Sequence, residues 1–219
     1  MIKRNKLKVI CFDVDGTLVN TDDVIIQTYI DLYHLYKKDS PIDVKKFKTF
    51  SGPPLNQTLK NEFPNLKYDF CYSEYKRLSL INYPKYIKSF ENCKEVLMDL
   101  KNNGFKLAIC SSKIHDSIRY SLKLCGIDGL FDIIIGLDDV KKPKPDKEGI
   151  DKILKHFNIS QDNLVFVGDT DYDILCAKNS GVSCIIMRIL ERNYKMLDDN
   201  IKCFNSYKEL GDYLINGRE

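Results

Sequence analysis

Two aspartates stand two residues apart directly after a short apolar run. Asp13 and Asp15 follow Val9–Phe12 and precede Gly16. Two carboxylates at the end of a buried strand repel each other, and removing them from water costs free energy unless a partner compensates. An Asp-Gly pair is also common in solvated turns, which is the other interpretation. We expect the pair to serve function, in chemistry that uses carboxylates to move protons, attack an electrophile or hold a cation.

A second group of aspartates follows another apolar run, Leu164–Val167. Asp169 and Asp173 are four residues apart, so they share one face if a helix begins there. Asp171 lies between them and suits the first turn of such a helix, whose dipole favours negative charge. Asp169 and Asp173 are therefore candidates to act together with the first pair.

Hydroxyl and ammonium groups follow two further apolar runs. Ser111 and Ser112 come after Leu107–Cys110. A hydroxyl there could hydrogen-bond a phosphoryl oxygen, although a serine after a strand is more often a helix cap or a turn residue. Farther along, two prolines stiffen the basic segment Lys142–Asp146, for which a solvent-exposed loop is the alternative.

The elements that must position these side chains are short apolar runs separated by helical patterns. The runs are nearly continuous, as expected for parallel strands covered on both faces. We expect strands at Val9–Phe12, Leu107–Cys110, Ile133–Ile135, Leu164–Val167 and Cys184–Met187. Helical patterns occur at Asn92–Asn103, Asp116–Leu124, Lys147–Phe157 and Asp171–Ser180. This alternation predicts an α/β fold with a doubly wound parallel sheet.

A long insert separates the first predicted strand from the second. Its first part, Asp22–Lys37, has apolar residues at helical spacing, and prolines divide the rest into further helices. We expect a helical cap domain over residues 20–90 and a core domain formed by residues 1–19 and 91–219. An insert in this position begins beside the reacting end of the sheet, which is the reason to expect a cap.

Together the motifs resemble the haloacid dehalogenase (HAD) superfamily over nearly the whole chain. The matching segments are Asp13–Leu18 (D-x-D-G-T-[LV]), Ser111, Lys142–Pro145 (K-P-x-P) and Gly168–Asp173 (G-D-x-x-x-D). The resemblance implies a five-stranded Rossmann-like sheet of order 5-4-1-2-3. That order places Asp13 beside Asp169 at the switch point, where α/β sheets bind their ligands.

The resemblance also implies a phosphatase that forms an aspartyl-phosphate on Asp13. Asp15 would protonate the leaving oxygen and then take a proton from the attacking water. The family pattern assigns Lys142 and Ser111 to the phosphoryl group, and Ser112 is a further candidate beside them. Asp15 argues against the dehalogenases of the superfamily, which lack the second aspartate.

The same resemblance brings four aspartates to one site and so predicts a metal ion. Asp13, Asp169, the backbone carbonyl of Asp15 and, through water, Asp173 are the expected ligands. Oxygen ligands without His or Cys select Mg²⁺.

The insert resembles the small helical cap of phosphoglycolate phosphatases, bacterial pyrophosphatases and β-phosphoglucomutases. Mutases of this group carry a His and a Trp in the first cap helix, whereas Ile25 stands near the His position here and the chain has no Trp. We expect a small phosphorylated substrate of the phosphoglycolate or pyrophosphate type. A phosphomutase and a non-catalytic protein that binds a phosphorylated ligand are the alternatives. Thr21, Arg77 and the loop Gly52–Leu55 are candidate cap contacts.

Composition argues against several other classes of protein. The chain has 219 residues, 43% of them hydrophobic, and a net charge of +3, which is too small to indicate nucleic-acid binding. The basic N-terminus leads into only a short apolar run, so we expect neither a signal peptide nor a membrane span. None of the eight cysteines forms a C-x-x-C pair, and we expect reduced, buried thiols in preference to disulfides or zinc. The expected protein is a cytoplasmic monomer or homodimer.

Overall fold

The chain forms two compact units joined by two crossings of the backbone. The computed structural model describes residue 2, residues 4–51 and residues 55–216. One unit consists of residues 1–19 and 89–219, and the other of residues 20–88. At the crossings, β2 (Val19–Asn20) and β3 (Lys88–Ser89) pair with each other as a two-stranded sheet.

Within the described residues, six parallel strands form the sheet of the first unit, in the order β5-β4-β1-β6-β7-β8. Their bounds are β1 Val9–Phe12, β4 Lys106–Cys110, β5 Ile133–Ile135, β6 Leu164–Gly168, β7 Ser183–Met187 and β8 Lys202–Phe204. The five predicted strands are confirmed to within one residue at their ends, in the predicted relative order. The predicted count was wrong, because β8 extends the sheet beyond β7. This strand begins with the exposed Lys202, so its sequence lacks the continuous apolar run by which the other strands were predicted.

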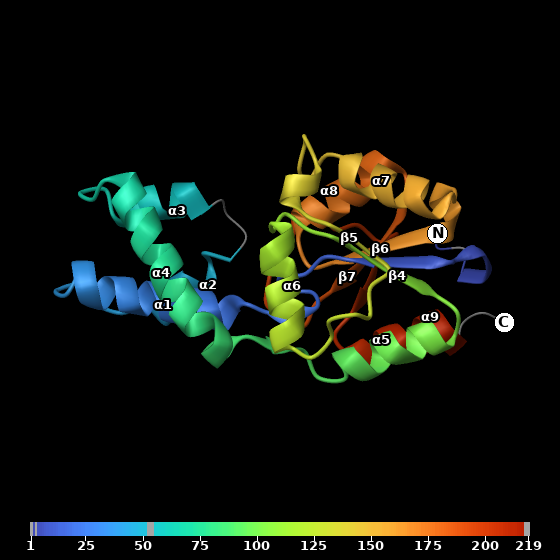
Figure 1. Ribbon diagram of the computed structural model, residues 1–219, viewed down its shortest axis with the longest axis horizontal. Helices are drawn as coiled ribbons and strands as arrows, with labels where there is room; N and C mark the ends of the chain where they lie inside the picture. Colours follow the sequence, from blue (N-terminus) through green and yellow to red (C-terminus); the bar gives the residue numbers. More distant parts are fainter. Residues whose placement is uncertain (1, 3, 52–54, 217–219) are drawn as a thin grey trace. The chain divides into compact units, whose positions relative to one another are not determined.

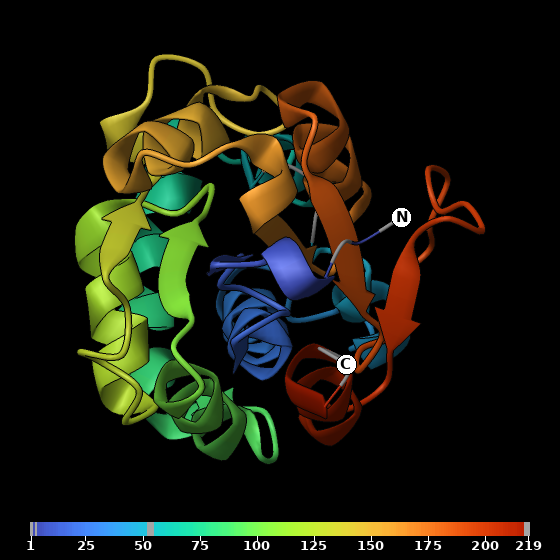
Figure 2. The ribbon, with the colours of Figure 1, turned by 90° about the vertical axis from the view of Figure 1, so that its right-hand side faces the viewer.

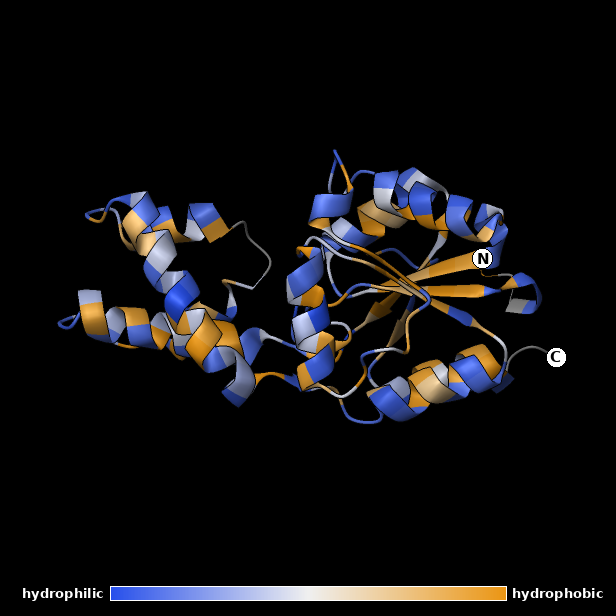
Figure 3. Cartoon of the chain, viewed as in Figure 1, coloured by the Kyte–Doolittle hydropathy of each residue, from blue (hydrophilic) through white to orange (hydrophobic). Residues whose placement is uncertain are grey.

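Two helices cover each face of this sheet (Figures 1 and 2). The pair α7 (Glu148–Phe157) and α8 (Asp171–Ser180) packs on one face, and α5 (Cys93–Asn102) and α9 (Tyr207–Ile215) pack on the other. A further helix, α6 (His115–Leu124), follows β4. Figure 3 shows mainly hydrophobic strands between helices whose outer faces are hydrophilic. The core is therefore the doubly covered sheet that the continuous apolar runs predicted.

Alternate residues of the strands supply the two apolar layers. Val9, Cys11 and Phe166 belong to one buried cluster with Ile150 and Ile153 of α7. Successive side chains of a strand point to opposite faces, so Ile10 and Phe12, both fully buried, face the α5–α9 side. The described part of this unit also contains three short 3₁₀ helices, at Arg4–Lys6, Leu137–Asp139 and Gln161–Asn163.

The second unit is helical and has its own aromatic core. It comprises α1 (Asp22–Tyr36), α2 (Val44–Lys48), α3 (Leu55–Glu62) and α4 (Tyr68–Tyr86). Tyr29, Tyr33 and Phe47 are buried, and the ring centroids of Tyr33 and Phe47 lie 4.9 Å apart. The predicted helix at Asp22–Lys37 is confirmed. Pro84, which was expected to separate helices, lies inside the last turns of α4.

None of the described helices is long and apolar enough to cross a membrane. The eight cysteines are all free thiols, five of them buried and three half-buried. Burial raises the pKa of Cys93 to about 12 and that of Cys125 to about 11. Both thiols are therefore protonated at neutral pH and react slowly, because the thiolate is the nucleophile.

We expect thiol titration of the unreduced protein in denaturant to detect all eight cysteines. The folded protein should react far more slowly, and its rate should rise with pH as thiolate forms. A clear deficit in the denatured, freshly purified protein would contradict the assignment of free thiols.

Candidate active site

β1 and β6 lie side by side in the sheet, and an aspartate follows each of them. Phe12 is opposite Val167 in the parallel ladder, and the backbone N–H of Asp13 donates to the carbonyl of Val167 over 2.9 Å. Asp169 follows the last residue of β6, and both aspartates are buried. Because carboxyl ends of parallel strands share one edge of the sheet, the two carboxylates are brought together as the motifs predicted.

The turn after Asp13 requires a glycine. Gly16 has φ +80°, and a Cβ at this position would lie 2.1 Å from Oδ2 of Asp169. Both the backbone conformation and the contact exclude an L side chain. The hydroxyl of the next residue, Thr17, donates to Oδ1 of Asp169 over 3.3 Å. The turn therefore packs directly against Asp169.

Asp173 lies in the first turn of α8 and is fully buried. Its Oδ2 accepts hydrogen bonds from the backbone N–H of Asp169 over 3.2 Å, the backbone N–H of Thr170 over 3.0 Å and the Thr170 hydroxyl over 2.7 Å. These three donors fix the carboxylate in place. Among the described residues, Asp13, Asp169 and Asp173 form a group in which one oxygen of each lies within 4.8 Å of the others.

Lys144 is the lysine that reaches this group. Its Nζ lies 2.8 Å from Oδ1 of Asp13 and 2.6 Å from Oδ1 of Asp173, and its side chain is only 5% exposed. Burial acts to lower the pKa of Lys144, but Asp13 and Asp173 raise it well above its usual value. Lys144 is therefore a buried, charged ammonium group in contact with two carboxylates.

The placement predicted for Lys142 is contradicted. Its side chain is exposed, and its backbone N–H donates to Oε2 of Glu148 over 3.0 Å. The segment contains two consecutive Lys-Pro pairs, and the full K-P-x-P pattern begins at Lys142. The path of the loop, and not the number of prolines, decides which ammonium reaches the aspartates.

The electrostatics of the group are dominated by burial. Burial raises the pKa of Asp13 to about 6, against the lowering effect of Lys144. Burial and the neighbouring Asp173 also raise the pKa of Asp169, while Arg192 opposes that rise. A further cation in this group would favour the charged forms of the carboxylates.

The donor set fits Mg²⁺. Three carboxylates face two protein cations, Lys144 and Arg192, so three negative charges against two positive ones leave one negative charge uncompensated. The group offers hard oxygen donors, with neither His nor Cys among them. Mg²⁺ prefers this kind of ligand and retains part of its water shell.

Asp15 stands apart from the three-carboxylate group. Its Oδ1 lies 2.8 Å from Nζ of Lys113, and the Asp15 side chain is 38% exposed. Its carboxylate is thus not one of the clustered oxygens among the described residues, and a ligand role through its backbone carbonyl stays a prediction. A half-exposed carboxylate held by an ammonium group is accessible for proton transfer.

The two predicted serines differ in their surroundings. Ser111 is buried at the end of β4, where its backbone N–H donates to the carbonyl of Ile135 over 3.0 Å. Its hydroxyl oxygen accepts from the backbone N–H of Lys113 over 3.3 Å. Ser112 is exposed. Ser111 is therefore held at the same edge of the sheet as Asp13, because β4 and β1 are parallel neighbours.

Besides Lys144 and Lys113, two further residues at the site were not predicted from the sequence. Thr17 was noted only as part of the first motif, and its contact with Asp169 depends on the turn at Gly16. Arg192 lies in an irregular segment after β7, where its Nε donates to Oδ2 of Asp169 over 3.0 Å. No periodicity or motif marks that segment, so the sequence offered no signal for it.

The predicted cap contacts lie in the second unit. Thr21 is buried, and Arg77 pairs with Glu74 on α4, with a bond of 2.7 Å between Nη2 and Oε2. Of the loop Gly52–Leu55, only Leu55 lies within the described residues. Arg77 thus lies in an exposed ion pair within one helix, and its contact with a substrate stays a prediction.

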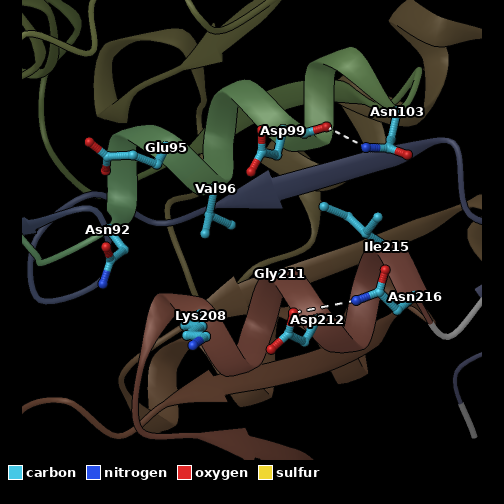
Figure 4. Close-up of a pocket in the computed structure, with 10 residues that line it drawn as sticks. All are labelled: Asn92, Glu95, Val96, Asp99, Asn103, Lys208, Gly211, Asp212, Ile215 and Asn216. Carbon is cyan, nitrogen blue, oxygen red and sulfur yellow. Dashed lines mark hydrogen bonds between the residues drawn. The ribbon is translucent and has the colours of Figure 1, made fainter.

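A separate hollow of about 370 Å³ lies between α5 and α9 (Figure 4). Val96 points toward Gly211 across the two helices, and polar side chains such as Glu95 and Lys208 line the opening. None of the clustered aspartates lines it. The hollow follows the seam between the two helices and is not part of the candidate active site.

Comparison with known proteins agrees with this geometry. A family model described as haloacid dehalogenase-like hydrolase matches residues 10–187. The chain is 31% identical over 188 residues to the pyrophosphatase PpaX of Halalkalibacterium halodurans, across 83% of this chain and 84% of that protein. It is 33% identical over 178 residues to the pyrophosphatase PpaX of Bacillus velezensis, across 80% of this chain and 81% of that protein.

The same fold occurs in a solved structure, a HAD-superfamily hydrolase of subfamily IA from Geobacter sulfurreducens. The TM-score is 0.76 at 22% identity, covering 95% of this chain and 97% of that one. With the site at the predicted edge of the predicted sheet, the resemblance expected from the motifs is confirmed. The chain belongs to the haloacid dehalogenase-like hydrolase family.

Proposed function

We propose that this hydrolase is a Mg²⁺-dependent phosphatase in which Asp13 is the nucleophile. The observation that carries the proposal is the buried group of Asp13, Asp169 and Asp173 with Lys144 in ion-pair contact with two of them. The relatives named pyrophosphatase support a substrate with a phosphoric anhydride or a small phosphate ester. Residues 20–88 would act as the cap that selects the leaving group.

Asp13, Asp169 and Asp173 would hold the cation. When bound, Mg²⁺ supplies charge that offsets the repulsion between a carboxylate nucleophile and an anionic phosphoryl group. Lys144 takes over the role predicted for Lys142, because its ammonium group contacts Asp13. Its fixed charge stabilises negative charge that develops at the phosphoryl oxygens. Ser111 would donate a hydrogen bond to the same group.

The reaction then has two half-steps. A carboxylate oxygen of Asp13 forms a bond to phosphorus while the bond to the leaving oxygen breaks, and Asp15 gives that oxygen a proton. Water next attacks the phosphorus of the aspartyl-phosphate and passes a proton to Asp15. Phosphate leaves and the Asp13 carboxylate is restored. Lys113 holds Asp15 in place for both transfers.

The experiment that tests this function is a panel of substrates assayed for phosphate release with Mg²⁺ and with EDTA. The panel contains pyrophosphate, phosphoglycolate, β-glucose 1-phosphate and p-nitrophenyl phosphate. We expect phosphate as the product, dependent on Mg²⁺. Isomerisation of β-glucose 1-phosphate that outruns phosphate release would favour a mutase. No turnover of any substrate would favour a protein that only binds phosphorylated ligands.

Replacement of Asp15 by Ala tests the proton transfer. General acid–base catalysis typically contributes about 10²–10⁴-fold, so turnover of alkyl phosphates should fall by that order. p-Nitrophenyl phosphate should suffer much less, because its leaving group barely needs a proton. Lys123→Ala, on the exposed face of α6, is the control. Equal losses for good and poor leaving groups would contradict the acid role of Asp15.

A further inference from the structure

The segment between β7 and β8 brings a largely buried arginine side chain to the aspartate group. Arg192 is 11% exposed, and its Nε donates to Oδ2 of Asp169 over 3.0 Å. Asp169 itself is 1% exposed. A guanidinium group in this position is an internal counter-ion for one of the three clustered carboxylates.

The segment that carries Arg192 is hydrogen-bonded to the first turn of α8. The carboxylate of Asp171 accepts hydrogen bonds from the backbone N–H of Lys195, over 2.9 and 3.1 Å, and from that of Met196, over 3.1 Å. Asp171 lies in the first turn of α8, two residues after Asp169. The backbone just beyond Arg192 is therefore held beside the carboxylate that Arg192 contacts.

Both oxygens of Asp169 already have partners within the protein. Thr17 donates to Oδ1 and Arg192 donates to Oδ2. A cation that binds Asp169 must share an oxygen with one of these donors. It also meets the positive charge of the guanidinium group at short range, where the partly dry surroundings screen repulsion poorly.

We propose that Arg192 competes with the divalent cation for Asp169 and thereby sets the metal affinity of the site. The inference rests on the proposed metal site at Asp13, Asp169 and Asp173. Arg192 acts through Asp169 and is a positioning residue. Without a bound divalent cation, Arg192 balances the charge of the Asp169 carboxylate. When the cation binds, Arg192 lowers the affinity of the site for it. Half-saturation of the protein therefore requires a higher Mg²⁺ concentration than the three carboxylates alone would need.

The test is a titration of the full chain with Mn²⁺ as the probe, in which electron paramagnetic resonance measures the free ion without any substrate. Arg192→Gln removes the positive charge. Arg192→Met also removes it and leaves no buried polar group, so it can be used if Arg192→Gln does not fold. We expect the dissociation constant to fall by at least about tenfold, the scale of a unit charge close to a divalent ion. Mg²⁺ competition should show the same shift.

Lys195→Gln is the matched control. It removes one positive charge from the same segment, but only the backbone N–H of Lys195 contacts Asp171, so the affinity should change by less than about twofold. A second readout is thermal unfolding in EDTA and in saturating Mn²⁺. The Arg192 variants should melt below the wild type in EDTA and gain more from Mn²⁺, because the two cations compete for one carboxylate.

The outcomes separate the inference from the function on which it rests. If the wild type binds no Mn²⁺, or if Asp169→Asn binds it as well as the wild type does, the proposed metal site is wrong. The inference about Arg192 then fails with it. If the wild type binds Mn²⁺ but the Arg192 variants bind it equally or more weakly, the inference alone is wrong. In that case Arg192 orients Asp169 for the metal or plays no part in binding it.

Discussion

Replacing Asp13 by Asn is expected to reduce phosphate release by more than about 10⁴-fold, the scale on which loss of a nucleophile acts. The amide has nearly the same shape as the carboxylate but cannot form the acyl phosphate. We do not expect a neighbouring carboxylate to replace it, since Asp169 and Asp173 are held by hydrogen bonds from Thr17, Arg192 and the turn at Thr170, and Asp15 is paired with Lys113. The measurement is phosphate release at saturating Mg²⁺, with Asp128→Asn, an exposed aspartate, as the control.

The same variant should fold as well as the wild type. Asp13 lies in a group with an excess of negative charge, so removing its carboxylate relieves repulsion with Asp169 and Asp173, and Lys144 keeps its ion pair with Asp173. Circular dichroism melting in EDTA should therefore show an unchanged or higher midpoint. Asp13→Asn protein that is folded and still hydrolyses substrate at the wild-type rate would rule out the covalent mechanism.

Lys144→Met is expected to lower kcat/KM by at least about 10²–10³-fold, the usual cost of removing one fixed group that stabilises the charge of a transition state. The loss should affect all substrates alike, because the ammonium group acts on the phosphoryl group that they share. Lys142→Met is the matched control, two residues away in the same loop. Its side chain is exposed, so its effect should stay within about twofold.

Stability distinguishes the two lysines as well. Removing one partner of a buried ion pair typically costs about 3–5 kcal/mol, so Lys144→Met should melt at a lower temperature in EDTA. Mg²⁺ should recover part of the loss, because it supplies positive charge to the same carboxylates. Rates are compared per folded molecule. A large loss of activity in Lys142→Met with normal turnover in Lys144→Met would reverse the assignment made from the contacts.

The parts of the fold that were predicted correctly are those in which local sequence and tertiary environment agree. The five predicted strands are all apolar runs, four of them in the interior of the sheet and β5 at its margin, and an aspartate or serine after such a run stands at the carboxyl edge of the sheet. β8 was not predicted because its three residues begin with an exposed lysine and form no continuous apolar run, whereas β5, also three residues long and at an edge, consists of three isoleucines. The expectation that Pro84 separates two helices was wrong, because a proline is tolerated near the end of a helix that tertiary contacts stabilise.

The errors at the site have a common cause. Lys142 and Lys144 have the same side chain and almost the same sequence context, and only the course of the loop brings one of them to Asp13. Arg192 reaches Asp169 because Asp171 fastens a distant segment to α8. Long-range contacts of this kind leave no periodic pattern, so spacing along the chain does not reveal them.

The pairing of β2 with β3 has a consequence for how such a chain can change. The helical insert leaves the core at Asn20 and returns at Lys88, and these two points are neighbours in one small sheet. The two ends of the insert therefore lie next to each other where they join the core. A tight turn could close the gap without moving β1, and every residue of the aspartate group would stay with the core. The insert can thus be exchanged as one continuous segment while the catalytic scaffold stays intact, and if it selects the substrate as proposed, substrate preference can diverge in this way.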